Sequence, residues 1–345
     1  MDHGACIMIR PSASIISVTA KISELYPLGV TKIKQLEGYD DLNFFVECER
    51  QEDGAEAEKY VCKIMNNIDS LEIDVVEAQH QIMERLHERG IVVSLPVLNR
   101  TNQYFSVERF NNVDHVFRLL TYIDGSKLND SEPSSQLYNN VGELVGKIYL
   151  ELKGLEIDAL HSRNSQWMLK NAPQILQYLP AVADAERRDI VKSFVKEFED
   201  FVVPMIPNLE SGVIHGDVNE HNLLVEEMRI AGLIDFGDVC YAPFLFEIAI
   251  CLTYMILHAK DLSVGREVLK GYQKFRQLTA TEIRLLRICV CSRMCQSLVL
   301  GCQSAVLYPG NEYALSSQKY GWPLLHQLFQ TANQRLLALW GLEKS

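Results

Sequence analysis

The segment VIHGDVNEHNLLV, Val213 to Val225, places a run of polar and charged side chains between two apolar ends. The apolar ends are typical of short buried strands. The polar residues between them include two histidines, Asp217 and, five positions later, Asn222. A solvated turn of this length rarely needs such a set, so the segment predicts a loop with a chemical role.

A second polar turn follows closely along the chain. In IAGLIDFGD, residues 230–238, an apolar strand delivers Asp235 into a turn. A strand–loop–strand hairpin would bring Asp217, Asn222 and Asp235 around one point. Phosphoryl transfer from a nucleotide needs a carboxylate for the attacking hydroxyl, here Asp217, and oxygen ligands for Mg²⁺, here Asn222 and Asp235. The alternative is a pair of turns with buried capping aspartates.

Length and composition restrict the class of protein. A chain of 345 residues favours two domains, and a net charge of -12 disfavours a nucleic-acid partner. The longest apolar run, residues 248–257, is about half of a membrane span, and the N-terminus has no secretory pattern, so we expect a cytoplasmic protein without membrane contacts. The nine cysteines form no CxxC pair and are expected to be reduced thiols.

Hydrophobic periodicity predicts an α+β fold with two lobes. Period-two segments predict antiparallel strands at residues 30–37, 42–49, 59–65, 103–110 and 115–123. A helix is expected at residues 69–90, capped by Asp69 or Ser70 and ended by Gly90. We therefore expect an N-terminal lobe, residues 1–122, with five strands and one helix, and a mainly helical C-terminal lobe, residues 123–345, that carries the two polar loops.

Together, HGDVNEHN and IDFGD resemble the catalytic and metal loops of the aminoglycoside phosphotransferase and choline kinase group, whose fold is similar to that of protein kinases. The resemblance extends from about Val30 to the C-terminal helices. It implies a kinase with Mg²⁺ and a nucleotide donor. It also implies a lysine on the third strand, here Lys63, that contacts phosphates and pairs with a helix glutamate, here Glu77. Otherwise Lys63 lies along an edge strand and Glu77 is a solvated helix charge.

The turn EGYDDLN, residues 37–43, departs from the protein-kinase pattern because it has no G-x-G-x-x-G. Asp40 and Asp41 would repel phosphates, so backbone N–H groups together with Asn43 are expected to make any phosphate contact. A plain hairpin turn is the alternative. The nucleotide base is expected to meet the backbone of Thr121, Tyr122 and Ile123.

The acceptor is expected to be a small molecule. Only six residues, DVCYAP, separate Gly237 from the helix expected at Phe244, which leaves no room for a peptide-holding segment. The segments HGDVNEHNLLVEE, LIDFGDVCYAPFLFEIAI and CSRMCQSLVLGCQSAVLYP resemble the hydroxylysine kinases of this group. That resemblance implies transfer from GTP to the 5-hydroxyl of 5-hydroxy-L-lysine. The alternatives are ATP as donor, choline, homoserine or an aminoglycoside as acceptor, and a non-catalytic protein on a kinase fold.

Four further residues are candidates for acceptor binding. Asp238 and Glu247 would meet ammonium groups, and Arg293 would hold a carboxylate with its planar guanidinium. Alternatively, Glu247 and Arg293 form a buried ion pair that only fixes helices. Trp167 either walls the pocket or fills the core.

Overall fold

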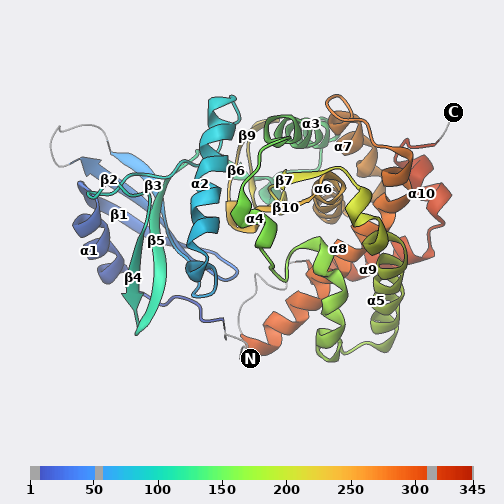
Figure 1. Ribbon diagram of the computed structural model, residues 1–345, viewed down its shortest axis with the longest axis horizontal. Coiled ribbons are helices and arrows are strands. Elements are labelled where there is room, and N and C mark those ends of the chain that lie inside the picture. Colours follow the sequence, from blue (N-terminus) through green and yellow to red (C-terminus); the bar gives the residue numbers. More distant parts are fainter. Residues whose placement is uncertain (1–7, 51–56, 309–316, 344–345) are drawn as a thin grey trace. The chain divides into compact units, whose positions relative to one another are not determined.

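The described chain divides into two compact units, Met1–Asp124 and Gly125–Ser345 (Figure 1). The structure is a computed structural model and describes residues 8–50, 57–308 and 317–343. The division falls close to residue 122, where the sequence analysis drew the boundary between the lobes.

The N-terminal unit is built on a five-stranded antiparallel sheet in the order β1-β2-β3-β5-β4. Asn111 and Asn112, both with positive φ, form the tight turn between β4 and β5, because asparagine tolerates the left-handed region. The five predicted strands are confirmed, and their bounds are β1 Leu28–Leu36, β2 Leu42–Arg50, β3 Glu58–Ile64, β4 Ser106–Phe110 and β5 Val113–Thr121.

A helix that the sequence analysis did not predict covers one face of this sheet. Helix α1, Ile15–Leu25, begins at Ser14, whose hydroxyl accepts the N–H of Ser17. Its residues Val18 and Ile22 pack on the alternate residues of β2, β3 and β5 that face them. The expectation of one helix in this lobe is therefore wrong, because the chain forms α1 as a second helix before β1.

The predicted helix lies on the other face of the sheet as α2, Ile73–Glu88, where Val76 packs on Met65 and Val116. Its predicted N-cap is wrong. Asp69 lies in a separate 3₁₀ turn, η1 Asp69–Leu71, and its carboxylate accepts from Asn66 instead. Gly90 does end the helix: its φ is +79°, and its N–H and that of the next residue donate to the last turn.

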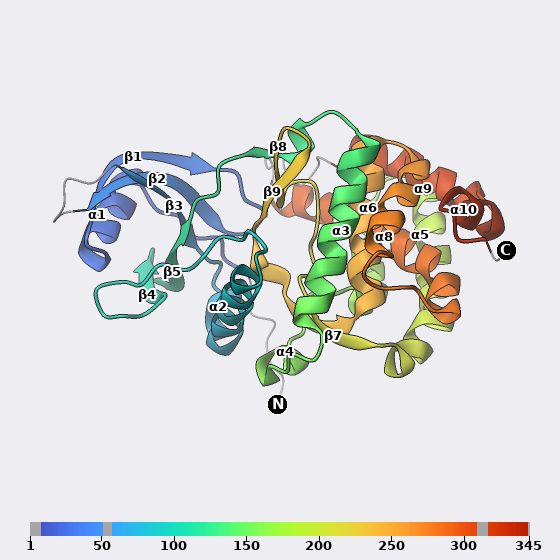
Figure 2. The same cartoon turned by 90° about the horizontal axis from the view of Figure 1, so that it is seen from above.

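The C-terminal unit is mainly helical, with α6 and α8 in its core. Helix α8 begins with a capping box between Thr279 and Glu282 and packs against α5, α6, α9 and η3 (Figure 2). Among the described helices, α8 is long and apolar enough to span a membrane, but 94% of that stretch is buried within the protein. Its cysteines Cys289, Cys291 and Cys295 are free and buried, and burial raises their thiol pKa values.

The helical elements of this unit have the following bounds. They are η2 Leu128–Asp130, α3 Ser135–Leu152, α4 Asp158–Ser162, η3 Leu169–Ala181, α5 Ala185–Glu197, η4 Phe198–Val202, η5 Val203–Asn208, η6 Phe236–Asp238, α6 Phe244–Ala259, η7 Leu262–Val264, α7 Gly265–Tyr272, α8 Ala280–Leu307, α9 Gln318–Gln330 and α10 Asn333–Leu339.

Two small sheets position the polar loops. Strand β7, Ser211–Ile214, pairs with β10, Cys240–Pro243, and β8, Leu223–Glu226, pairs with β9, Arg229–Leu233, and with β6, Ser126–Lys127. The first polar loop therefore connects β7 to β8, and the second leaves β9. Because β8 and β9 are hydrogen-bonded neighbours, the two loops start from adjacent positions.

Candidate active site

The loop between β7 and β8 holds one oxygen of the Asp217 carboxylate. Asn219 Nδ2 and Asn222 Nδ2 each donate to Asp217 Oδ2 at 2.8 Å. Asn219 Oδ1 also accepts the backbone N–H of His221 and of Asn222, at 2.8 and 2.9 Å. Hydrogen bonds within the loop thus fix its shape, and 18% of the Asp217 side chain remains exposed.

The other oxygen of Asp217 is held by a buried cation from α8. Arg293 donates to Asp217 Oδ1 at 2.9 Å and to the carbonyl of Trp167 at 2.7 Å. Its guanidinium lies 5.3 Å from the ring centroids of Trp167 and Tyr254, and its side chain is 1% exposed. Burial raises the pKa of Asp217, and the Arg293 cation opposes that rise.

The turn before Asp217 is held by Glu247 of α6. This buried carboxylate accepts the backbone N–H of His215 and of Gly216, the latter at 3.1 Å. Burial raises the pKa of Glu247 to about 7, while these two N–H donors act in the opposite direction. Gly216 has a φ of +79°, and a Cβ there would clash with the carbonyl oxygen of Asp238, so the turn needs glycine.

The second polar loop lies beside the first. The N–H of Ile234 donates to the carbonyl of Asn222 at 2.9 Å, which joins the two loops directly before Asp235. Asp235 has a φ of +63° and accepts the N–H of Gly237 at 3.3 Å. The Asp235 charge contributes, after burial, to the raised pKa of Asp217.

These residues fit a divalent cation bound jointly with a ligand. The amide nitrogen of Asn222 points to Asp217, and its Oδ1 has no donor among the described residues. The Asp235 carboxylate and the Asn222 amide oxygen match Mg²⁺, which proteins usually hold with one or two carboxylates plus water and phosphate oxygens. Within the described ranges, no group of three His, Cys, Asp or Glu residues is placed to hold a metal by itself.

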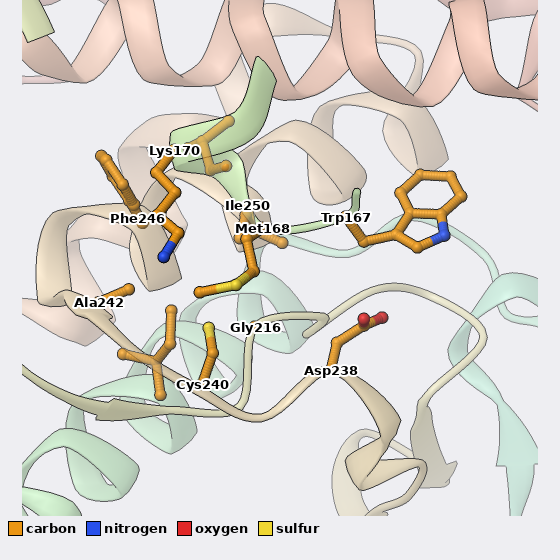
Figure 3. A pocket seen from close by; sticks show the side chains of 11 residues that line it. Trp167, Met168, Lys170, Gly216, Asp238, Cys240, Ala242, Phe246 and Ile250 are labelled. Atoms are coloured by element: carbon orange, nitrogen blue, oxygen red, sulfur yellow. The ribbon is translucent and has the colours of Figure 1, made fainter. Parts of the chain in front are cut away.

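A small pocket lies beside Gly216, the residue that precedes Asp217 (Figure 3). Gly216 and Asp238 line it, together with Trp167, Lys170 and Phe246. Trp167 is half-buried, so the structure favours its placement as a pocket wall over a core position. Burial, with the neighbouring Asp217 charge, raises the pKa of Asp238 to about 7, and the cations of Arg163 and Arg293 oppose this.

In the N-terminal unit, Lys63 on β3 is buried and forms an ion pair with Asp41 Oδ2 at 3.0 Å. Asn43 lies opposite Lys63 in the β2–β3 pairing, so their side chains share a face of the sheet. Glu77 is exposed on α2 and makes no hydrogen bond or ion pair with another described residue. The predicted Lys63–Glu77 pair is therefore wrong, because the Glu77 side chain faces solvent.

The segment at the end of β5 was expected to meet the nucleotide base. The N–H of Thr121 donates to the carbonyl of Leu95 at 2.8 Å, and that of Tyr122 donates to Lys59 at 3.1 Å. Ile123 follows directly, and no described residue accepts its N–H. Of the three predicted backbone donors, the structure thus leaves Ile123 available to a ligand.

Comparison with known proteins agrees with this architecture. Residues 32–284 match the family described as the phosphotransferase enzyme family. The chain is 32% identical to hydroxylysine kinase from Bos taurus, and the match covers 96% of this chain and 94% of that protein. It is 30% identical to hydroxylysine kinase from Mus musculus, and that match covers 99% of this chain and 96% of the mouse protein. In fold it is similar to an amicoumacin kinase solved with AMP-PNP, Ca²⁺ and its ligand, with a TM-score of 0.69, 16% identity and coverage of 94% and 97%.

The chain therefore belongs to the phosphotransferase enzyme family and is a small-molecule kinase that transfers phosphate to a hydroxyl group. Within this family it groups with the hydroxylysine kinases, which confirms the resemblance seen in its sequence. The kinase-like fold, with an antiparallel five-stranded sheet and a mainly helical second unit, is confirmed as well.

Two expectations about the acceptor residues need correction. Glu247 and Arg293 do not pair with each other: Glu247 accepts loop N–H groups, and Arg293 holds Asp217. Both side chains are buried and already hydrogen-bonded within the protein, so neither is placed to contact a substrate. Asn219 was not predicted as a site residue. A signal for it exists in the sequence, because an asparagine in a loop often accepts the backbone N–H groups two and three residues ahead, as Asn219 does here.

Replacing Glu247 by alanine is expected to destabilise the fold. Two buried N–H groups would lose their acceptor, which lowers the free energy of unfolding by on the order of 2 to 4 kcal/mol. Urea unfolding of the full chain measures this, with exposed Glu199→Ala as a control expected within about 0.5 kcal/mol of the parent. Unchanged stability combined with weaker acceptor binding would instead restore Glu247 as a substrate ligand.

Proposed function

We propose that the chain transfers the γ-phosphate of GTP to the 5-hydroxyl of 5-hydroxy-L-lysine. The observation that carries the proposal is the Asp217 carboxylate, oriented by Arg293 and two asparagines beside a donor set suited to Mg²⁺. The relatives named hydroxylysine kinase, which match nearly the whole chain, support the acceptor. The choice of GTP over ATP follows the same resemblance.

Asp217 is proposed as the general base. Its carboxylate accepts the proton of the acceptor hydroxyl while that oxygen bonds to the γ-phosphorus. The bond from the γ-phosphorus to the β–γ bridging oxygen breaks, and the nucleotide diphosphate leaves. The three donors around Asp217 hold its carboxylate in one orientation, so little reorganisation is needed before the proton moves.

Asn222 and Asp235 are proposed to hold Mg²⁺ through their side-chain oxygens. When bound, the ion neutralises phosphate charge that builds up during transfer. In the N-terminal unit, Lys63 is proposed to bind phosphate oxygens with its ammonium, with Asn43 beside it. The free N–H of Ile123 suits an acceptor on the edge of the base.

The pocket next to Asp217 is proposed to bind the amino-acid part of the acceptor. Hydroxylysine carries two ammonium groups and one carboxylate. Asp238 is the proposed partner of an ammonium, because a cation there would stabilise its half-buried carboxylate. Trp167 supplies an apolar wall, and Lys170, which lines the same pocket, replaces Arg293 as the proposed partner of the carboxylate.

An acceptor panel tests the function. The purified chain with Mg²⁺ and either GTP or ATP is expected to phosphorylate 5-hydroxy-L-lysine, detected as a mass increase of one phosphate. Lysine, which lacks the hydroxyl, is the matched control and should stay unmodified. Turnover of choline, homoserine or an aminoglycoside but not of hydroxylysine would overturn the acceptor, and turnover of none would favour a non-catalytic role.

Asp217→Asn is expected to lower kcat by at least about 10³-fold, the scale of loss when a catalytic centre is dismantled. Asparagine keeps an oxygen for Arg293, so the fold and nucleotide binding should persist. Single-turnover kinetics with saturating acceptor measure the loss, and exposed Asp158→Asn serves as the control. A variant with parental kcat would remove Asp217 from the proposed mechanism.

Arg293→Met is expected to shift the pH profile of kcat/KM. The Arg293 cation lowers the pKa of Asp217, and the base must be ionised to accept a proton. Without the cation the pKa rises, so the acidic limb of the profile should move to higher pH. Arg287→Met on the same helix, whose arginine pairs with Glu197, is the control that should leave this limb in place.

A further inference from the structure

The carboxylate that accompanies Lys63 comes from the β1–β2 turn and not from helix α2. We propose that Asp41 is the positioning residue that holds the Lys63 ammonium for nucleotide phosphates. This inference rests on the proposed role of Lys63. It reverses the expectation that the aspartates of this turn only repel phosphate.

Asp41 is itself rigidly held. While Oδ2 contacts Lys63 Nζ at 3.0 Å, Oδ1 accepts the backbone N–H of Asn66 at 2.8 Å and its Nδ2 at 3.2 Å. Asn66 also donates to Asp69 Oδ2 at 2.6 Å, and its Oδ1 accepts the N–H groups of Ile68 and Asp69 at 3.0 Å. The turn after β3 thus anchors Asp41, and Asp41 anchors the lysine of the same strand.

The Lys63–Asp41 ion pair lies largely out of water. The Lys63 side chain is 6% exposed and that of Asp41 is 15% exposed. A buried ammonium needs a partner charge, since its desolvation costs several kcal/mol. Loss of the Asp41 charge would therefore change the position of the Lys63 ammonium.

Helix α2 cannot supply this charge. Its buried polar residues Gln79 and His80 face the sheet, and both bind Arg118, at 2.7 and 2.9 Å. Burial, with the nearby Arg118 cation, lowers the pKa of His80 to about 3, so this partner is neutral. Arg118 lies opposite Lys63 in the β3–β5 pairing, so two cations share this face. Asp41 supplies a negative charge there.

The alternative role for Asp41 is to block Lys63 until the nucleotide displaces it. The anchoring of Oδ1 by Asn66 favours positioning, because a displaced Asp41 would also leave the Asn66 backbone N–H. The two roles predict opposite effects of neutralising Asp41. Positioning predicts weaker nucleotide binding in Asp41→Asn, whereas blocking predicts tighter binding.

Asp41→Asn in the full chain is expected to raise the Kd and KM for GTP at least about tenfold, the scale of a lost charge-assisted hydrogen bond. The KM for the acceptor should stay unchanged. Glu77→Gln, which removes a carboxylate from the same unit without touching Lys63, is the matched control and should bind GTP as the parent does. Asp41→Glu, which restores the charge, should recover part of the affinity.

Tighter GTP binding by Asp41→Asn, or a loss in Glu77→Gln without one in Asp41→Asn, would overturn the inference. Thermal unfolding of each variant separates a loss of positioning from misfolding. If Asp41→Asn does not fold, Asn66→Ala takes its place. That variant removes one hydrogen bond to Asp41 and is expected to weaken GTP binding as well. Parental GTP affinity in Lys63→Met would instead refute the role proposed for Lys63. Absence of acceptor turnover with intact GTP binding would refute only the proposed acceptor.

Discussion

The ion pair between Asp217 and Arg293 is the interaction on which the active-site region depends. Arg293 lies in the middle of α8, a helix that is buried along most of its length. The Arg293 guanidinium therefore has no contact with solvent. It must meet acceptors where it is, and these are the Asp217 carboxylate and the Trp167 carbonyl. A core helix thereby sets the position of the polar loop and of one pocket wall.

The same rule, that a buried charge or donor is matched by a partner, explains most of the surrounding structure. Glu247 satisfies two loop N–H groups that would otherwise be buried without an acceptor. In the N-terminal unit, Asp41 compensates Lys63, and Arg118 is held by neutral groups. Each of these partners fixes a side chain in one geometry. Such preorganisation is what positioning of phosphates and of a reacting hydroxyl requires.

Much of the fold could be predicted because its signals are local. The alternate residues of β2, β3 and β5 that pack in the cluster with α1 follow directly from the period of two in the sequence. The succession of strands along the chain, the place of α2 after the third strand and the end of that helix at Gly90 follow from patterns a few residues long. Helix α1 and the start of α2 were missed or misplaced, because α1 buries little and Asp69 found a partner in Asn66 rather than in a helix terminus.

By itself, the sequence identified the residues that we propose carry the chemistry of the polar loops, since Asp217 and Asn222 are close along the chain and Asp235 follows β9, the strand that pairs with β8. Only the tertiary structure decided which partners these groups have. Arg293 lies 76 residues from Asp217, Glu247 lies 31 residues from Gly216, and Asp41 reaches Lys63 across a strand pair. The physical reason is that packing decides which charges pair in a protein interior. Glu77 lies on the solvent-facing side of α2, and Asp41 pairs with Lys63.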